Sequence, residues 1–480
     1  MKNFLWDLLK YIPNKIIPAL LGFLTLPILT RIFSTEDFGE YSLCLATISV
    51  LTILVTWVNQ SNIRFFHHYD ALGQKDDFII NNLILGLISI VLASAFYLVI
   101  LLLFKNNISQ SFFHLLLITC ANFILLSTFL LLQNFLRIQS KVLTFSTYTV
   151  LNKIIAFFTG LALVYLYSRD ISMMLWGAVI SQVILLPIVF RSAIELKTFK
   201  FILSKPISKQ LFSYGLPLVI SNIAAWVLTL SSRYQLSIIR SNEDVGIYSA
   251  GTSVSDHSIL LISQLILLAA YPIGVKIFEN KGEKAAALFE QRVTGIFLCL
   301  SLPAVIGFIT VSKLFFRVFM GVEFYQGFVI IPFVVFGSFF FGLQQRFQSG
   351  LLYKKQTKYI TRSTVIAAIT NIITNYFLIS YFGYIGAAIG NCFSYLILLI
   401  LVIIYSNKFF HWRFPFEIMI ISLFGSGIMS LSIIAFDNIS INSQILKLIL
   451  EIIIAVFVYS TTVYVLIPKR IINTYKETFK

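Results

Sequence analysis

Charged side chains are scarce in this chain, where they make up 12% of 480 residues, while 58% of the residues are hydrophobic. This balance excludes an ordinary water-soluble domain, because about a quarter of the residues in such a domain are charged. Cysteine is scarce as well, and the four cysteines lie far apart, without paired or CxxC spacing. The sequence therefore indicates no disulfide framework, no cysteine metal site and no cofactor.

The hydrophobic residues are gathered in long continuous runs, such as 83–104, which contains no charged side chain. A helix needs about 20 apolar residues to cross a bilayer, whereas a strand of a membrane barrel would show about ten alternating positions. The sequence therefore predicts an all-α integral membrane protein with about fourteen transmembrane helices.

The first expected crossing is the N-terminal apolar segment, which contains Pro13 and Pro18 and lacks the small-residue cleavage site of a removable signal. The bounds of the expected crossings are accurate to about two to four residues. The expected crossings are 11–30, 42–60, 80–104, 111–135, 144–166, 171–190, 210–231, 245–269, 288–311, 326–345, 363–381, 384–405, 415–435 and 445–467.

Lysine and arginine are distributed unevenly between the two sides of these crossings. Of the 36 basic residues, 25 lie on the side of the two termini, 4 lie within crossings, and the other side carries 7: Arg31, Lys105, Arg169, Arg233, Arg240, Lys313 and Arg317. Because basic residues near crossings are retained in the cytoplasm, both termini are expected there. This asymmetry explains the net charge of +16 without a nucleic-acid partner.

A nine-residue motif occurs twice. Residues 34–42 read STEDFGEYS and residues 241–249 read SNEDVGIYS, and six of the nine positions are identical. A recurring helix-start pattern would explain the acidic pair, which suits a helix N-terminus. The copies, however, follow the first and the seventh crossing, which favours duplication of a six-helix unit. The two bundles would be related by a pseudo-twofold axis along the membrane normal, as in alternating-access transporters.

Four regions follow from this division. We expect an N-terminal six-helix bundle over 1–190, a basic cytoplasmic linker over 191–209, a second six-helix bundle over 210–405, and an extra helix pair with a tail over 406–480.

The sequence resembles the polysaccharide repeat-unit flippases, the Wzx-type exporters of O-antigen and capsule units, within the superfamily that includes the multidrug and toxic-compound extruders. The resemblance covers essentially the whole chain. The segments that carry it are 13–39 with Pro27–Arg31 and the Phe38–Gly39 turn, Tyr214–Pro217, Val245–Ser249 and Gly383–Ala388.

The resemblance implies a two-lobed bundle around a central cavity and a transporter rather than an enzyme. The implied cargo is an oligosaccharide linked to undecaprenyl pyrophosphate, moved from the cytoplasmic to the periplasmic leaflet of the bacterial inner membrane for O-antigen, lipopolysaccharide or capsule assembly. The implied partners are this cargo and membrane lipids. A polysaccharide polymerase and a chain-length regulator are further candidate partners, and proton or sodium coupling is left open.

Charged residues inside crossings are the first candidates for the transport path, because a pyrophosphate needs a hydrated, cationic route past hydrocarbon. Lys153 lies well inside the fifth crossing and is expected to face a cavity, unless it snorkels along its helix or has a structural partner. Asp256, beside His257 in the eighth crossing, is either a proton-coupling carboxylate or a counter-ion to a cavity cation.

Four arginines near the ends of crossings are further candidates. Arg64 and Arg292 are expected at the cytoplasmic mouth, and Arg31 and Arg233 at the periplasmic ends of the first and seventh crossings. Guanidinium groups there suit a phosphate headgroup, although topology charges and helix-end snorkelling account for the same positions. Lys447 and Glu451, four residues apart, are expected to pair with each other.

Three alternatives remain open. A multidrug extruder and a lipid-linked peptidoglycan-precursor flippase belong to the same superfamily. A membrane polysaccharide polymerase, ligase or glycosyltransferase would need a sizeable extramembrane region, whereas the expected loops are short. The adjacent aspartates, Asp76 and Asp77, lack a metal-site context.

Overall fold

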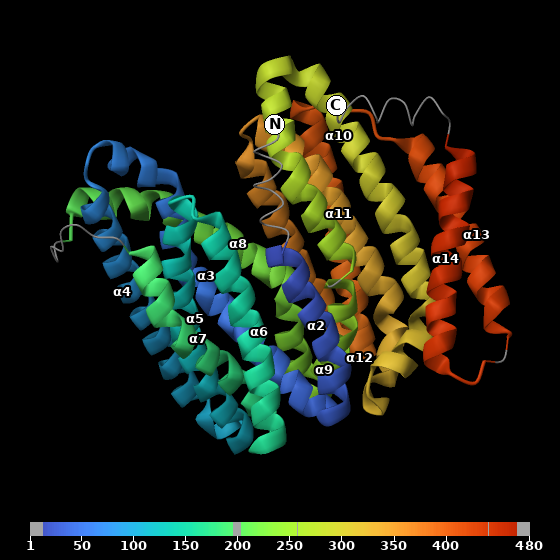
Figure 1. Ribbon diagram of the computed structural model, residues 1–480, viewed down its shortest axis with the longest axis horizontal. Helices are drawn as coiled ribbons and strands as arrows, with labels where there is room; N and C mark the ends of the chain where they lie inside the picture. The colour runs from blue at the N-terminus through green and yellow to red at the C-terminus, as the bar shows by residue number, and fades with distance from the viewer. Residues whose placement is uncertain (1–12, 195–202, 257, 440, 468–480) are drawn as a thin grey trace. The chain divides into compact units, whose positions relative to one another are not determined.

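The computed structural model describes residues 13–194, 203–256, 258–439 and 441–467, and in this part of the chain the secondary structure is helical, without strands (Figure 1). The predicted all-α class is confirmed. Both chain ends, and residues 195–202 of the linker expected over 191–209, lie outside the described residues.

The helices follow one another through short connections. Their bounds are α2 Pro13–Ile32, α3 Thr35–Ala71, α4 Lys75–Leu103, η1 Lys105–Asn107, α5 Gln110–Ile138, α6 Val142–Leu166, α7 Ser172–Ala193, α8 Lys205–Ile239, α9 Asn242–Asp256, α10 Ile259–Phe319, η2 Val322–Ile330, α11 Ile331–Tyr353, α12 Thr357–Phe409, α13 Phe416–Asp437 and α14 Gln444–Leu466.

Two of these helices contain a sharp turn at a glycine. Gly282 in α10 has a φ of 80° and Gly383 in α12 has a φ of 56°, a region of backbone conformation that favours glycine because it has no Cβ. Eleven helical runs of the described chain are long and apolar enough to cross a membrane, and α2 is a shorter apolar helix. Dividing α10 and α12 at their glycines and adding α2 is consistent with the fourteen crossings predicted.

The chain divides into two compact units. The first contains Glu36–Tyr234 and the described part of residues 1–21, and the second contains Gly22–Thr35 and the described part of residues 235–480. In the first unit, aromatic and aliphatic residues from α3, α4, α5, α7 and α8 form one core that includes Trp57, Phe78 and Phe135. Helices α6 and α7 approach closely at Gly160 and Gly177, as small residues allow in membranes.

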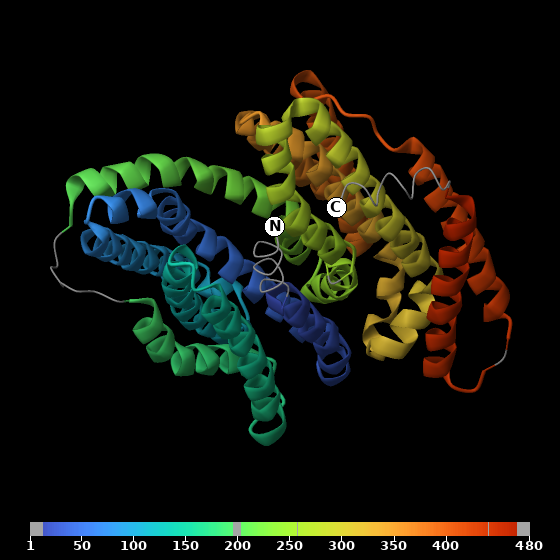
Figure 2. The same cartoon turned by 45° about the horizontal axis from the view of Figure 1, so that its top comes forward.

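In the second unit, α10, α11 and α12 pack together, and the C-terminal pair α13 and α14 lies beside α10 (Figures 1 and 2). The end of α2 is held in this unit by polar contacts. Arg31 donates a 2.6 Å hydrogen bond to the carbonyl oxygen of Val318, and the backbone N–H of Thr35 donates to the carboxylate of Glu323 at 3.2 Å.

The start of the first motif copy contacts the second copy within the second unit. A Cβ added to Gly246, in the second copy, would lie 1.9 Å from the carbonyl oxygen of Thr35, in the first copy. The repeated glycine is therefore required by close backbone packing as well as by a helix start.

We expect Gly246→Ala to lower the free energy of unfolding by about 1–3 kcal/mol, because the added methyl group overpacks a rigid backbone contact. Thermal unfolding of the purified protein in detergent would measure this. Gly427→Ala is the matched control, since a Cβ there meets no atom within 4 Å and alanine is the better helix former. Equal unfolding temperatures for the two variants would contradict the packing interpretation.

Candidate functional site

Lys153 lies near the middle of α6 and is solvent-exposed. It shares one face of the helix with Ser146, Gly160 and Val164, which are spaced seven, seven and eleven residues from it. Ser146 is 5% exposed, Val164 is 1% exposed and Gly160 is buried. Lys153 is therefore an exposed residue on a helix face whose other members are buried.

The face of α6 that would contact lipid is a different one. It is marked by a stripe of exposed apolar side chains at spacings of seven or eight residues: Leu143, Leu151, Phe158 and Tyr165. Lys153 lies roughly 130° around the helix from the centre of this stripe at 100° per residue. Within the described residues its ammonium group has no hydrogen-bond or ion-pair partner. Lys153 is thus placed outside the stripe of exposed apolar side chains on α6.

Polar side chains form a buried network beside Lys153 in the first unit. Ser181 of α7 donates at 2.9 Å to the side-chain oxygen of Asn152, and Gln182 donates at 2.9 Å to Asn122 of α5. In a membrane protein such bonds hold helices together and satisfy groups that hydrocarbon cannot.

Two of the candidate arginines lie in the first unit. Arg64 is exposed in α3, which continues past the expected crossing to Ala71. Arg233 was expected at a periplasmic helix end, but α8 extends to Ile239, and Arg233 is only 8% exposed. It lies next to Tyr234, whose hydroxyl is 2.5 Å from that of Thr47. Arg233 is therefore part of a packed helix interior.

The remaining candidates lie in the second unit and are not brought together with one another. Arg31 donates its hydrogen bond to the carbonyl oxygen of Val318 at the end of α10, which is a structural contact. Arg292 is half-buried in α10, and its Nε is buried without a partner among the described residues. Asp256 is the last residue of α9 and is exposed, because the expected eighth crossing is interrupted between α9 and α10. His257 lies outside the described residues.

A buried charged cluster in the second unit was not found from the sequence. Glu290 of α10 and Arg346 of α11 are each 1% exposed, close enough to interact electrostatically, and Tyr353 donates a hydrogen bond to Glu290. Stacked rings of Tyr271 and Phe278 cover Tyr353. One carboxylate oxygen of Glu290 and two guanidinium nitrogens of Arg346 are buried without a partner in the described chain.

The sequence carried a signal for half of this cluster. Glu290 lies inside the expected crossing 288–311, where an acidic residue is costly unless it has a partner. The expected crossings 326–345 and 363–381 place Arg346 at the start of the connection between them, on the side of the termini. This placement is wrong, because α11 continues to Tyr353 and buries the guanidinium. The pairing of Lys447 with Glu451 is wrong as well. Lys447 instead forms an ion pair with Asp437 at 2.5 Å.

A second buried network joins the two halves of α12 to α9. Asn371 donates to the side-chain oxygen of Asn391 at 2.6 Å and to Ser394 at 3.3 Å. Asn391 in turn donates to the hydroxyl of Tyr248 at 2.5 Å. Within the described residues, no group of three or more histidine, cysteine or acidic side chains could hold a metal ion.

The family model for polysaccharide biosynthesis proteins matches residues 4–278, more than half of the chain. The chain belongs to this family. This polysaccharide biosynthesis protein is 22% identical over 264 residues to a probable low-salt glycan biosynthesis flippase of Haloferax volcanii. That alignment covers 55% of this chain and 56% of the relative, so this chain spans about half of that relative's length in the match.

Among solved structures, the polysaccharide biosynthesis protein has the fold of the lipid II flippase MurJ in an inward closed conformation. The TM-score is 0.78 at 16% identity, covering 99% of this chain and 100% of that one. An inward-facing multidrug transporter of the MATE family in the MOP superfamily gives 0.63 at 12% identity, covering 83% and 94%. These likenesses and the family membership confirm the superfamily predicted from the sequence, and the similar proteins are transporters and flippases.

We expect Arg346→Met to lower the free energy of unfolding by about 3–5 kcal/mol, because it leaves the Glu290 carboxylate buried without its counter-charge. The double variant Glu290→Gln with Arg346→Met should recover much of this loss. Thermal unfolding of the single and double variants in detergent measures the coupling. Additive losses in the double variant would mean that the two groups do not stabilise each other.

Proposed function

We propose that this polysaccharide biosynthesis protein is a flippase that moves a lipid-linked oligosaccharide repeat unit across the membrane by alternating access. The cargo is a glycan carried on undecaprenyl pyrophosphate, transferred from the cytoplasmic to the periplasmic leaflet of a bacterial inner membrane for O-antigen or capsule assembly. Family membership and the MurJ-like and MATE-like fold support the transporter class. The residues below support the class of cargo.

The observation that carries the proposal is Lys153. An unpaired ammonium group at mid-membrane depth is costly beside lipid, and its position on the packed face of α6 removes it from the lipid-facing stripe. A cation that is accessible there suits an anionic group in transit, and a pyrophosphate is such a group. The proposed role of Lys153 is to bind that headgroup during translocation.

The buried amides of the first unit support Lys153 as a binding group held in a fixed position. Asn122, Asn152 and Gln182 are at most 6% exposed and already bond one another or Ser181. They keep α5, α6 and α7 in fixed register around Lys153, so the cation is presented by a rigid helix surface.

The orientation follows from the loops. The excess of lysine and arginine on one side supports cytoplasmic termini and a headgroup that first meets the exposed Arg64. A multidrug extruder is the alternative within the superfamily, but Lys153 on the path would repel the cationic compounds that such a protein would carry. Short connections between the described helices leave little room for the acceptor and donor sites of a polymerase.

We expect deletion of the gene in its host to remove surface polysaccharide and to accumulate undecaprenyl-linked repeat units in the cytoplasmic leaflet. Complementation with Lys153→Ala should restore export about 10-fold to 100-fold less well than the wild type, since a charge-assisted hydrogen bond is worth about 1.5–3 kcal/mol. Lys153→Arg should restore more. Gel separation of surface polymer and extraction of lipid-linked intermediates measure both quantities.

Lys105→Ala is the matched control, because Lys105 is an exposed lysine of the same unit whose ammonium group lies over the ring of Phe113. It should complement fully at equal protein abundance. Unchanged surface polymer after deletion, in a strain without a redundant exporter, would contradict the polysaccharide assignment. Full complementation by Lys153→Ala would remove that lysine from the path while leaving the flippase assignment in place.

A further inference from the structure

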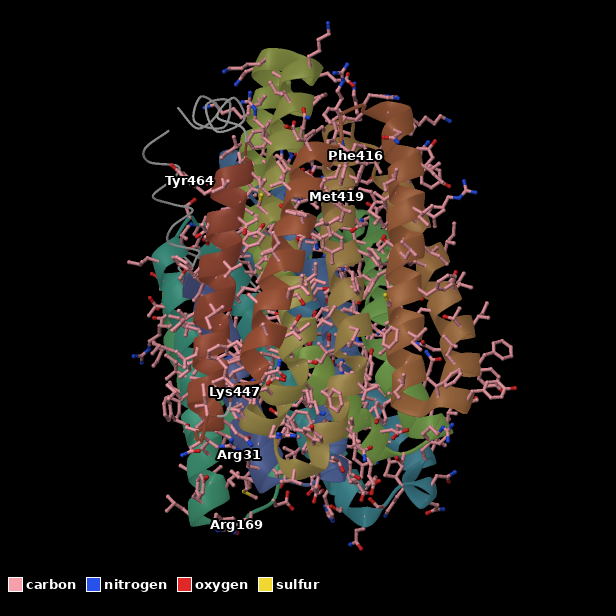
Figure 3. All side chains as sticks on the ribbon, turned by 90° about the vertical axis from the view of Figure 1, so that its right-hand side faces the viewer. Arg31, Arg169, Phe416, Met419, Lys447 and Tyr464 are labelled. Atoms are coloured by element: carbon pink, nitrogen blue, oxygen red, sulfur yellow. The ribbon has the colours of Figure 1, made fainter. Side chains whose placement is uncertain are left out.

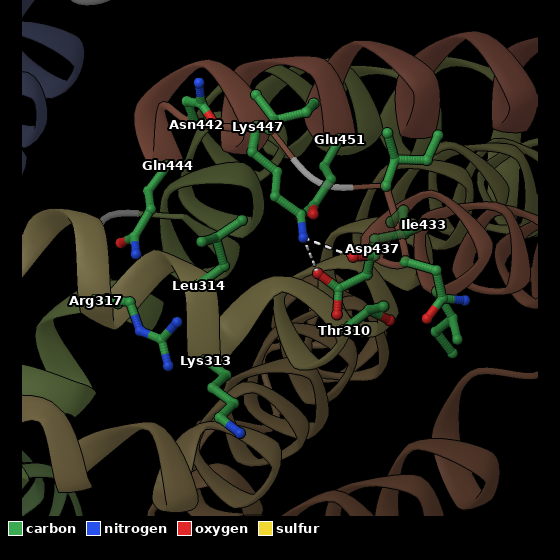
Figure 4. A pocket seen from close by; sticks show the side chains of 14 residues that line it. Thr310, Lys313, Leu314, Arg317, Ile433, Asp437, Asn442, Gln444, Lys447 and Glu451 are labelled. Carbon is green, nitrogen blue, oxygen red and sulfur yellow. Dashed lines mark hydrogen bonds and ion pairs between the residues drawn. The ribbon is translucent and has the colours of Figure 1, made fainter.

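A cavity of about 540 Å³ lies between α10 and the C-terminal pair α13 and α14, entirely within the second unit (Figure 4). This volume is in the range of small-molecule sites, at about 300–1,000 Å³. Figure 3 shows Lys447 at the opposite end of α14 from Tyr464 and toward the same end of the unit as Arg31. The loop charges assign that end to the periplasmic side.

One wall of the cavity is cationic. Lys313 and Arg317 lie four residues apart on one face of α10, and both are exposed. Arg317 lies over the ring of Tyr325 at 5.8 Å, which orients its guanidinium. Lys313 has no hydrogen-bond or ion-pair partner among the residues that the structure describes. Two neighbouring cations on the side with few basic residues form a site for a phosphate.

The opposite wall presents an acceptor. Glu451 of α14 is 2% exposed, lines the cavity, and has one carboxylate oxygen that is buried without a hydrogen-bond partner in the described chain. The ammonium group of the nearby Lys447 already binds Asp437. It forms an ion pair with the Asp437 carboxylate at 2.5 Å and donates a hydrogen bond to the Asp437 backbone carbonyl at 2.7 Å. A buried acceptor of this kind calls for a donor from a ligand, such as a hydroxyl group.

We propose that this cavity binds the phosphorylated, hydroxyl-bearing headgroup of a lipid, with phosphate on Lys313 and Arg317 and a sugar hydroxyl donating to Glu451. The two walls together fit a glycosyl phosphate better than a bare phosphate, which would leave Glu451 without a donor. This inference rests on the proposed function for its choice of a lipid-linked sugar. It adds a second site, at the periplasmic end, that holds the headgroup after translocation.

The test uses the full-length protein, delipidated in detergent and titrated by native mass spectrometry. The probes are a short polyprenyl diphosphate bearing one N-acetylglucosamine, the same polyprenyl diphosphate without sugar, phosphatidylglycerol and inorganic phosphate. The sugar-bearing probe should bind the wild type about tenfold more tightly than phosphatidylglycerol. Inorganic phosphate should not displace it.

The double variant Lys313→Gln with Arg317→Gln should bind the sugar-bearing probe about tenfold more weakly, or weaker still, than the wild type. Glu451→Leu should remove the preference for the sugar-bearing over the sugar-free probe, and Glu451→Gln should retain part of it, because the amide oxygen still accepts a hydrogen bond. The matched control is Lys281→Gln with Lys284→Gln, two exposed lysines that flank the Gly282 turn of α10 and do not line the cavity. This variant should bind the probe normally.

Three results would overturn the inference. Equal binding of phosphatidylglycerol would make the cavity an ordinary phospholipid site, displacement by inorganic phosphate would make it a free-anion site, and unchanged binding in the cationic double variant would remove the site altogether. Because binding is measured without transport, loss of the headgroup in these variants would support the cavity even where gene deletion left surface polysaccharide intact.

Discussion

The structure depends on one constraint, which is that hydrocarbon offers no hydrogen-bond partner to a polar group. The backbone meets the constraint by forming helices over most of the described chain. Side chains meet it in a second way, by bonding across helix contacts, as Asn152 does with Ser181 and Asn371 with Asn391. The places that leave a polar group without a partner therefore identify the positions where water, cargo or a charge must enter.

Three such positions differ in character. Lys153 is accessible and unpaired in the described chain, which suits a transient ligand. Glu290 and Arg346 are inaccessible and lie within electrostatic range of each other, and Tyr353 donates a hydrogen bond to Glu290, which links α11 to α10. Glu451 is inaccessible itself but borders an open cavity. Burial and the presence of a partner together distinguish Lys153, the proposed path residue, from the buried structural residues. Neither property can be read from residue type alone.

The sequence was sufficient for the class and for most helices, because a run of about 20 apolar residues has the length of a helix that crosses a bilayer. It also made Lys153 a candidate, since a lysine inside such a run must be accommodated. The prediction from the sequence failed where a helix continues beyond its apolar segment. Arg346 looked like a loop residue because charge follows it in the sequence, yet the helix continues and folds the arginine inward. Lys447 pairs with Asp437, ten residues earlier and on another helix, rather than with its own helix neighbour, and one-dimensional spacing cannot represent that geometry.

The contact between Arg31 and Val318 sets an order of events during synthesis. The two residues are 287 positions apart, so at about 5–20 residues per second the end of α2 waits roughly 15 to 60 seconds for its partner on α10 to be made. For that interval, the guanidinium at the end of the first crossing has only lipid headgroups, water or the insertion machinery to contact. Helix α2 is therefore made early but gains its contact with α10 late. Truncation of the chain anywhere before α10 would leave α2 without this contact.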